Sequence, residues 1–322
     1  MRPLLSVSEL KVHFPVRRGL VRALDDVSLE VGTAETVGLV GESGCGKTTL
    51  GKAILRLVKP TAGSIRLAGT EIADMSRALL RPLRREMQMI FQDPQASLNP
   101  RQTVASIIEE PMIVHNIGTR TERQEKVAWL MARVGMRTDA AGRYPHEFSG
   151  GQRQRIGIAR ALALNPKLIV CDEPVSALDV SVRAQVVNLL EDLKREFELS
   201  YLFISHDLSV VEHVSDRIAV MYLGRIVETA EGRSLWKRPL HPYTRALISA
   251  VPVPDPAFAS RRVVLQGDPP SPIDPPSGCR FRTRCPYPTQ LCSEKEPELR
   301  HIDGTHQMAC HYLPDERTPH KR

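Results

Sequence analysis

Residues 41–48 read GESGCGKT and follow the pattern G-x-x-x-x-G-K-[ST], directly after the apolar run TVGLVG (36–41). Its glycines let the backbone wrap closely around an anion, so that amides and the N-terminus of a following helix face phosphate oxygens. Lys47 can neutralise β/γ-phosphate charge, and the Thr48 hydroxyl can ligate Mg²⁺. Cys45 lies beside Lys47 near the expected helix N-terminus, which favours a lowered thiol pKa. The residues expected to contact a nucleotide are Gly41, Glu42, Ser43, Gly44, Cys45, Gly46, Lys47, Thr48 and Thr49.

An acid pair occurs in KLIVCDEP (167–174), after four apolar residues that indicate a buried strand. Asp172 is placed to hold Mg²⁺, directly or through water, and Glu173 to polarise an attacking water. Surface carboxylates are the alternative, but acids directly after a buried strand are seldom placed only for solubility. His206 follows another apolar run, YLFI, so its imidazole is expected at the carboxyl edge of the sheet, where ligands bind in open α/β folds.

The elements that must position these residues are short buried strands that alternate with helices. Residues 36–41, 167–172 and 199–206 are apolar runs typical of parallel strands. In residues 181–197, apolar residues recur at helical spacing with charged residues between them, which predicts an amphipathic helix packed on the sheet. The alternation indicates an α/β fold, and the lack of repeats or heptads excludes solenoids and coiled coils.

The composition is that of a globular protein. The chain has 322 residues, 42% hydrophobic and 25% charged, which excludes disordered and fibrous classes. Its net charge of +7 favours anionic ligands or surfaces without choosing among them. Because it has no long apolar run and no secretory core near its start, we expect a cytoplasmic protein.

Proline content divides the chain near residue 240. Residues 1–238 hold 10 of the 25 prolines, whereas residues 239–322 hold 15. The stretches VPVPDPAFAS and GDPPSPIDPPSG predict an extended connector, because proline fixes φ and removes amide donors. We therefore predict a nucleotide-binding domain over 1–240 and a small proline- and cysteine-rich C-terminal region over 241–322.

Four cysteines of the C-terminal region are spaced C-x5-C-x6-C-x17-C, among three arginines. Zinc ribbons usually carry closer cysteine pairs, and a cytosolic location argues against structural disulfides. Metal ligation is the favoured interpretation. The arginines would offset thiolate charge, and the bound metal would stabilise a region that has few large apolar residues. His306 and His311 could also ligate a metal, so Zn²⁺ is one alternative, and free thiols are the other. The cysteines are Cys279, Cys285, Cys292 and Cys310, and the arginines are Arg280, Arg282 and Arg284.

These motifs, each present once and in the expected order, resemble the nucleotide-binding subunits of ABC transporters. The signature of that family is present as FSGGQ (148–152), which opens the helical pattern GGQRQRIGIARAL. From the residues alone, Ser149 is a good N-cap whose helix aims amides at an anion. The resemblance implies that the signature contacts the γ-phosphate of ATP held by a second subunit, so that two chains sandwich two ATP molecules. The signature residues are Ser149, Gly150, Gly151 and Gln152.

Four further positions match the family one at a time. Gln92, in MIFQDP, corresponds to the glutamine that senses Mg²⁺ and the attacking water while its loop contacts the membrane subunits. Asp179, in SALD, corresponds to the loop that crosses the dimer interface, with a helix cap as the alternative. His206 matches the histidine that contacts the γ-phosphate. Phe14 matches the aromatic ring that stacks under adenine, and His13 is the competing candidate for that role. Core packing is the other interpretation of Phe14. The implied Mg²⁺ ligands are Thr48, Gln92 and Asp172, and the implied catalytic residues are Glu173, His206 and Gln92.

A narrower resemblance covers nearly the whole chain. FQDPQASLNPRQTV, HPYTRAL and the cysteine-bearing tail are similar to the ATPase subunits of oligopeptide, dipeptide and nickel importers, particularly the second of their two different ATPases. It implies a P-loop NTPase core with a helical signature subdomain (about 93–165), and ATP hydrolysis coupled to solute import. It also implies a related ATPase as heterodimer partner, two permease subunits, an external solute-binding protein, and a peripheral position on the cytoplasmic face of the inner membrane. Some such ATPases bind a [4Fe-4S] cluster through a similar cysteine set, with Zn²⁺ as the alternative.

Two other functional classes compete with the importer. A non-transport ABC ATPase acting on nucleic acid or ribosomes would suit the basic charge, and an exporter ATPase is a third possibility. Lys47 and Ser149 are 102 residues apart, which leaves no room for the inserted zinc modules of excision-repair ATPases, and the chain has only one phosphate loop. The solute itself is not encoded in this chain, because other subunits select it.

Overall fold

The computed structural model describes residues 3–17, 19–251, 263 and 265–312. The chain forms two compact units, each assembled from segments that are distant in sequence. Unit 1 comprises Met1–Leu5, Val31–Thr36 and Leu67–Ile204, and unit 2 comprises Ser6–Glu30, Val37–Arg66 and Ser205–Arg322. The connector predicted at VPVPDPAFAS lies, apart from Val251, outside the described residues, and the boundary near residue 240 stays a prediction. Within the described part of the chain, no helix has the length and apolar character needed to cross a membrane.

Parallel strands form the sheet of unit 1. They are β6 (Met87–Ile90), β7 (Leu168–Asp172) and β8 (Ser200–Ile204), in the order β8-β7-β6. Every residue of β7 and β8 is buried, as their apolar runs predicted. The register places Asp172 beside Ile204 and Cys171 beside Ile90. Residues that follow β6 and β7 therefore emerge at the same edge of the sheet.

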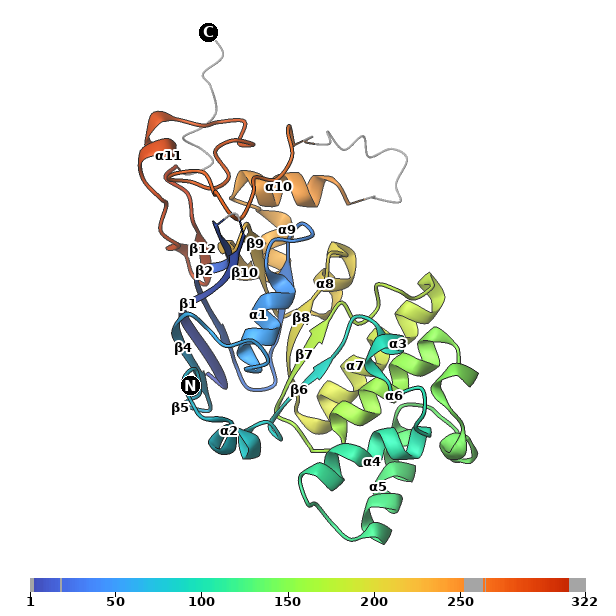
Figure 1. Cartoon of the computed structure of the whole chain (residues 1–322). Helices are drawn as coiled ribbons and strands as arrows, with labels where there is room; N and C mark the ends of the chain where they lie inside the picture. The colour runs from blue at the N-terminus through green and yellow to red at the C-terminus, as the bar shows by residue number, and fades with distance from the viewer. Residues whose placement is uncertain (1–2, 18, 252–262, 264, 313–322) are drawn as a thin grey trace. The chain divides into compact units, whose positions relative to one another are not determined.

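One long helix packs on this sheet, and shorter helices of unit 1 pack on one another (Figure 1). The long helix α7 (Val180–Phe197) buries Val186, Leu190 and Leu193, and the Tyr201 hydroxyl of β8 donates to the Leu190 carbonyl oxygen at 3.0 Å. This confirms the predicted amphipathic helix. The other elements of unit 1 are β5 (Thr70–Glu71), α2 (Arg77–Leu83), α3 (Pro94–Ser97), α4 (Val104–Val114), α5 (Arg120–Arg133), η1 (Thr138–Gly142), η2 (Pro145–Glu147) and α6 (Gly150–Leu162).

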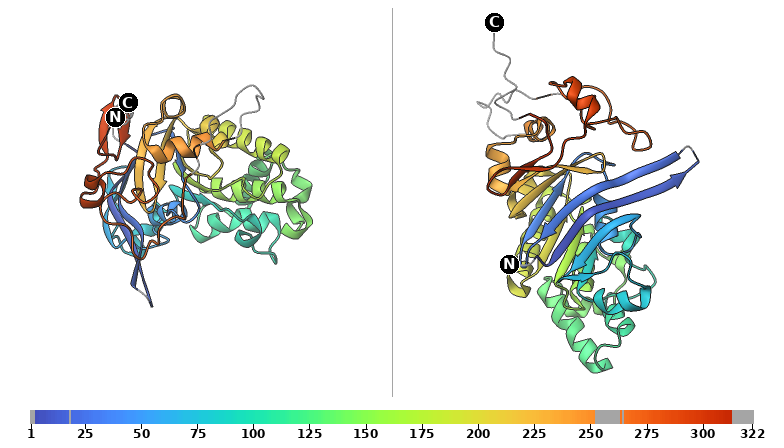
Figure 2. Two further views of the ribbon diagram at one scale, coloured as in Figure 1. Left: turned by 90° about the horizontal axis from the view of Figure 1, so that it is seen from above. Right: turned by 90° about the vertical axis from the view of Figure 1, so that its left-hand side faces the viewer.

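Unit 2 contains strands of two sheets. In the first, β1 (Leu5–Val16) lies between β2 (Gly19–Val31) and β4 (Ala62–Leu67), and Figure 2 shows β1 and β2 as a long blue pair. In the second the order is β11-β12-β10-β9-β3, with β3 and β9 parallel and the outer pairs antiparallel. Its strands are β3 (Thr36–Val40), β9 (Arg217–Tyr222), β10 (Arg225–Glu231), β11 (Arg300–Asp303) and β12 (His306–Met308). The helices of unit 2 are α1 (Lys47–Ile54), α8 (Leu208–Val214), α9 (Gly232–Lys237), α10 (Pro242–Ser249) and α11 (Gln290–Glu294).

Residues 265–312, which we call the extension, join unit 2 through buried aromatic rings and through strand pairing. Tyr222, Tyr243 and Phe281 form a cluster with ring centroids 4.7 to 5.5 Å apart, and none is more than 2% exposed. Each such buried ring contributes roughly 1.5–3 kcal/mol relative to an exposed one. Strand β12 adds to β10, so the extension also continues the sheet that carries β3 and β9. The extension thus shares the core of unit 2 and does not need one of its own.

Candidate functional site

The predicted phosphate loop connects strand β3 to helix α1 in unit 2. At two positions the loop lies so close to neighbouring backbone that only glycine fits. Gly41 has φ 154°, and a β-carbon there would lie 2.1 Å from the Met221 carbonyl oxygen. Gly46 has φ 112°, and its β-carbon would lie 2.5 Å from the Ala23 carbonyl oxygen. The loop is therefore held tightly against neighbouring backbone, and no larger residue fits at either position.

Lys47, the first residue of α1, is the buried cation of this loop. Its side chain curls back so that Nζ donates to the carbonyl oxygens of Gly41 at 2.8 Å and Glu42 at 2.9 Å. The residue is only 5% exposed. The loop's own carbonyls thus hold the ammonium group within the loop, where its positive charge suits an anion.

The expected low pKa of the Cys45 thiol is wrong. Cys45 is buried, and burial raises the pKa of its thiol despite the attraction of Lys47 for the thiolate. The free energy lost by removing the thiolate from water is larger here than the free energy gained from its attraction to the neighbouring ammonium group. Cys45 is thus a small packing residue of the loop.

His206 lies in the turn between β8 and α8, and its neighbours fix that turn. The Ser205 hydroxyl accepts from the Asp207 amide at 2.9 Å, and the Asp207 carboxylate caps α8 by accepting from the Ser209 amide at 3.1 Å. Both flanking side chains therefore have local structural roles. The His206 side chain is exposed, as expected for a residue that meets a ligand at the edge of a sheet.

The predicted acid pair and Gln92 come together in unit 1. Asp172 ends β7 and is only 3% exposed. Glu173 has φ 46°, a left-handed conformation that is strained for a residue with a β-carbon, and its amide donates to the Ile204 carbonyl oxygen at 2.9 Å. Gln92 follows β6, and its Nε2 donates to Glu173 Oε2 at 2.7 Å. The two side chains that were expected to meet the attacking water thus contact each other.

The signature residues open helix α6. Ser149 is its N-cap: the Ser149 hydroxyl accepts from the Gln152 amide at 3.3 Å, and Gln152 Oε1 accepts from the Ser149 amide at 3.0 Å. This capping box confirms the local prediction for Ser149. Ser149 and Gly150 are exposed, whereas Gly151 is buried where a β-carbon would lie 2.3 Å from Val182 Cγ1 of α7. The helix N-terminus therefore faces outward while its glycine allows α6 and α7 to pack closely.

Asp179 precedes α7 but does not cap it. Its backbone has the extended conformation of an N-cap residue, and its side chain makes no capping hydrogen bond. The carboxylate is exposed. The capping interpretation of Asp179 is therefore wrong, and its side chain is available for contacts outside this chain.

Phe14 and His13 point to different environments on β1. Phe14 is 38% exposed, which excludes core packing as its role. His13 Nε2 lies 3.2 Å from Oδ1 of the buried Asp25, whose other oxygen is paired with Arg280. Its two arginine neighbours lower the pKa of the Asp25 carboxyl against the opposing effect of burial. His13 is thus bonded to the buried Asp25, while the Phe14 side chain is exposed.

The metal prediction for the four tail cysteines is not supported by the structure. Among the described residues, no group of three or more His, Cys, Asp or Glu side chains is placed to hold a metal ion. Cys310 instead packs with Leu240 and Met308 in a small apolar cluster. Burial raises the pKa of Cys279 to about 11, and a neutral thiol is a poor metal ligand.

The side chains expected to assist a metal are also engaged elsewhere. His306 bonds to the buried carboxylate of Glu228 at 2.7 Å, and His311 to the Lys295 carbonyl oxygen at 2.8 Å. The tail arginines do not serve thiolates: Arg280 pairs with Asp25, Arg284 with Glu42, and Arg282 donates to the Ser277 carbonyl oxygen at 2.9 Å. The partners of these arginines are therefore carboxylate and carbonyl oxygens. The spacing of cysteines and arginines along the chain could not indicate these partners.

Two residues that contact the phosphate loop escaped the sequence analysis. The Tyr243 hydroxyl accepts from the Glu42 amide at 2.8 Å. Arg284 Nη1 and Nη2 lie 2.6 and 3.0 Å from the two carboxylate oxygens of Glu42. The only sequence signal for Tyr243 was its place in HPYTRAL, and for Arg284 its place in the arginine-rich tail.

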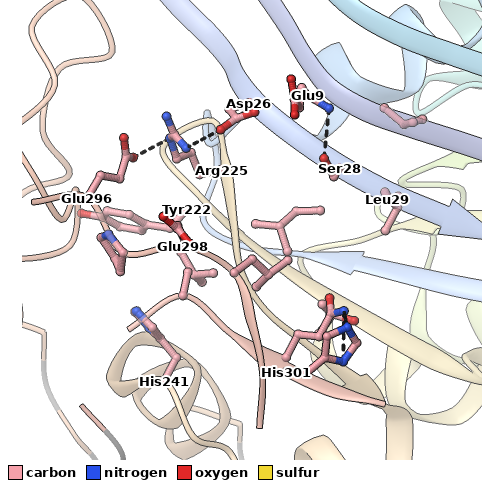
Figure 3. A pocket seen from close by; sticks show the side chains of 18 of the residues that line it. Glu9, Asp26, Ser28, Leu29, Tyr222, Arg225, His241, Glu296, Glu298 and His301 are labelled. Carbon is pink, nitrogen blue, oxygen red and sulfur yellow. Dashed lines mark hydrogen bonds and ion pairs between the residues drawn. The ribbon is translucent and has the colours of Figure 1, made fainter. Parts of the chain in front are cut away.

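A separate cavity of about 890 Å³ in unit 2 is lined by β1, β2, β9, β10 and the extension. Figure 3 shows Arg225 at its wall between Asp26 and Glu296, with contacts of 3.3 and 2.6 Å. Burial raises the pKa of the Glu296 carboxyl against the opposing pull of the arginines. The charges on this wall are thus largely paired with one another, so the cavity offers no single strong charge to a ligand.

The chain matches known protein families over the regions that contain this site. A family model described as "ABC transporter" matches residues 24–176, and one described as "Oligopeptide/dipeptide transporter, C-terminal region" matches residues 227–292. The chain is 55% identical over 318 residues to the oligopeptide transport ATP-binding protein AppF of Bacillus subtilis, covering 96% of this chain and 97% of that one. The chain belongs to the ABC transporter ATP-binding proteins. Its function class is thereby an ATP-hydrolysing subunit that works with membrane permease and ATPase partners.

Further relatives and solved structures are similar to this ABC ATPase. It is 54% identical over 308 residues to a putative peptide import ATP-binding protein of Brucella abortus, covering 96% of this chain and 97% of that one. The solved ATP-binding cassette MJ0796, a dimer bound to ADP and Pi, matches with TM-score 0.66 and 28% identity over 71% of this chain and 99% of that one. CbiO1 of Clostridium perfringens matches with TM-score 0.66 and 26% identity over 74% and 92%. The ABC-type mixed α/β fold is thereby confirmed, and an ATPase acting on nucleic acid or ribosomes is not favoured.

Proposed function

We propose that this ABC ATPase drives the import of oligopeptides or dipeptides. The observation that carries the proposal is the family match over residues 227–292, which reaches the part of unit 2 that contacts the phosphate loop. Relatives named for oligopeptide transport and peptide import, similar over almost their whole length, support it. The intact lysine, signature serine and acid pair support an active rather than a silent ATPase.

The proposed chemistry assigns one role to each element of the site. Lys47 binds the β- and γ-phosphates. Thr48, Asp172 and Gln92 would hold Mg²⁺, which would supply positive charge to offset that of the phosphates. Glu173, oriented by Gln92, takes the proton of the attacking water, and His206 contacts the γ-phosphate. The remaining nucleotide contacts come from Phe14 under adenine and from the loop residues Gly41, Glu42, Ser43, Gly44, Cys45, Gly46 and Thr49.

The proposed assembly is a pair of ATPase subunits on two permease subunits. The exposed Ser149 and Gly150 and the uncommitted carboxylate of Asp179 suit contacts with ATP and backbone of a second, related ATPase. The loop that contains Gln92 would contact the permease. An external solute-binding protein would deliver the peptide, and the ATPase would lie peripherally on the cytoplasmic face of the inner membrane. The predicted tail metal has no place in this proposal.

The test is transport by the reconstituted complex. The chain, its co-encoded ATPase and permeases, and the binding protein are placed in lipid vesicles, and uptake of labelled di-, tri- and hexapeptides is measured together with ATP hydrolysis. We expect peptide-stimulated hydrolysis and uptake, both lost in Lys47→Ala. Uptake of Ni²⁺ without any peptide uptake would replace the proposed substrate class. Export of peptide from preloaded vesicles would reverse the proposed direction.

A further inference from the structure

Glu42, the second residue of the phosphate loop, connects the extension to the loop's cation. Its carbonyl oxygen accepts from Lys47 Nζ at 2.9 Å, and its amide donates to the Tyr243 hydroxyl at 2.8 Å. Its carboxylate makes two hydrogen bonds to Arg284, at 2.6 and 3.0 Å. One loop residue is thus bonded at all three of its polar groups, two of them to residues C-terminal to β10.

The Glu42–Arg284 pair has the geometry of a strong ion pair. Both carboxylate oxygens meet the planar fork of the guanidinium, the arrangement that best matches the two groups. The Arg284 side chain is only 6% exposed, and its guanidinium lies 6.0 Å from the Tyr222 ring centroid. Hydrogen bonding to Glu42 raises the pKa of Arg284, so the cation is fixed at every physiological pH.

An uncompensated carboxylate would harm a phosphate site at this position. Glu42 lies in the loop that is proposed to hold the most highly charged part of ATP, and like charges at short range repel strongly where solvent screening is weak. With Arg284 in place, the carboxylate is neutralised, and the charge of Lys47 remains the dominant one in the loop. The position of Arg284 therefore matters to the phosphates without requiring that Arg284 touch them.

We propose that Arg284 is a positioning residue of the nucleotide site, through which the extension sets the affinity for ATP. It cancels the charge of Glu42 and, with Tyr243, holds the loop in the shape that aims its amides at phosphate. The inference rests on the proposed nucleotide-binding role of the loop. It gives the extension, whose residues 265–292 lie within the match to the oligopeptide/dipeptide transporter C-terminal region, a direct effect on the ATPase site.

Nucleotide affinity of the purified full-length chain tests the proposal. Binding of MgATP is measured by competition with a fluorescent ATP analogue, and kcat and KM by phosphate release from the reconstituted complex. We expect Arg284→Met to weaken MgATP binding roughly tenfold, within the range of coupling between contacting charged groups, and to raise KM with kcat nearly unchanged. The loss should grow at low ionic strength, where the unpaired Glu42 charge is least screened.

Rescue distinguishes a charge effect from simple loss of packing. In Glu42→Gln/Arg284→Met no charge remains to repel phosphate, so most of the affinity should return. The matched control is Arg282→Met, because Arg282 lies in the same segment and, among the described residues, its guanidinium donates to Ser277 and not to the phosphate loop. We expect this control to bind MgATP like the unaltered chain.

Each outcome decides the proposal. Failure of the double variant to recover affinity, or an equal loss in Arg282→Met, would show that Arg284 only stabilises the extension and would overturn it. Unchanged affinity in Arg284→Met would also overturn it. Lys47→Ala separates this inference from the proposed function: if that variant also binds MgATP normally, the phosphate-site assignment fails, whereas a loss there with normal binding in Arg284→Met sinks only the role of Arg284.

Discussion

Gln92 Nε2 donates a 2.7 Å hydrogen bond to Glu173 Oε2. The two residues follow neighbouring parallel strands, β6 and β7, whose register brings their carboxyl ends to one edge of the sheet. The amide of Gln92 thereby fixes the orientation of the Glu173 carboxylate, the group that we propose as the base. This relationship gives the first two predictions.

Glu173→Gln should keep MgATP binding and lower hydrolysis by about 10²- to 10⁴-fold, because the amide has the shape of the carboxylate but cannot accept the proton. The variant should accumulate as an ATP-bound dimer. Steady-state phosphate release and size-exclusion chromatography with ATP measure the two effects. Turnover near that of the unaltered complex would show that Glu173 is not the base.

Gln92→Ala should lower kcat by roughly tenfold, because Glu173 loses the bond that orients it. The same change made in Glu173→Gln should have little further effect, since the group that Gln92 orients is already gone. A double-mutant cycle on kcat measures this coupling. Additive losses would mean that Gln92 acts independently of Glu173, for example through the permease contact alone.

Ser149→Arg should depress hydrolysis by the paired ATPases by about tenfold or more while leaving ATP affinity of the isolated subunit nearly intact, because Ser149 is proposed to serve the nucleotide of the partner. Ser149→Ala is the matched control. It removes the cap of α6, at a cost of about 1 kcal/mol in stability, without placing a bulky cation at the helix N-terminus. Equal loss of affinity and hydrolysis in Ser149→Arg would place Ser149 in the pocket of its own chain.

Phe14→Ala should raise the Kd for ATP by roughly 5- to 150-fold, the equivalent of losing one base-stacking contact. Phe14→Trp should restore the affinity, because indole offers a larger ring face. His13→Ala should affect the protein mainly through its bond to Asp25 and therefore change thermal stability more than Kd. A greater loss of affinity in His13→Ala than in Phe14→Ala would reverse the assignment.

The Cys279 thiol should make stability depend on pH in the alkaline range. Its ordinary pKa is 9.0, and burial raises it to about 11 in the folded chain. The folded protein therefore keeps this proton where the unfolded chain loses it, so the stabilising contribution is complete below pH 9 and is lost as pH rises toward 11.

Urea unfolding of the metal-free chain between pH 8 and pH 11 measures this effect against Cys279→Ser, which has no thiol to titrate. Iron, zinc and acid-labile sulfide are determined on the same anaerobic sample. A pH-independent difference between the two proteins would contradict the raised pKa. Stoichiometric metal bound to the tail would show that the cysteines rearrange on loading from the arrangement described here.

Features set by local chemistry were predictable from the sequence. The phosphate loop follows from glycines whose backbone no other residue can adopt, and the buried strand before Asp172 follows from continuous apolar residues. The cap at Ser149 depends only on residues three positions apart. In each case the determining interaction lies within a few residues or within the periodicity of one element, so the sequence of that element contains it.

The tertiary structure alone decided which C-terminal residues contact the phosphate loop. Tyr243 of α10 and Arg284 of the extension reach Glu42 across 201 and 242 residues, and no local pattern records such a pairing. The same reason explains the failed metal prediction, because spacing along the chain does not make side chains converge in space. Burial decided the pKa of Cys45, since the sequence showed the neighbouring lysine but not the loss of water around the thiol.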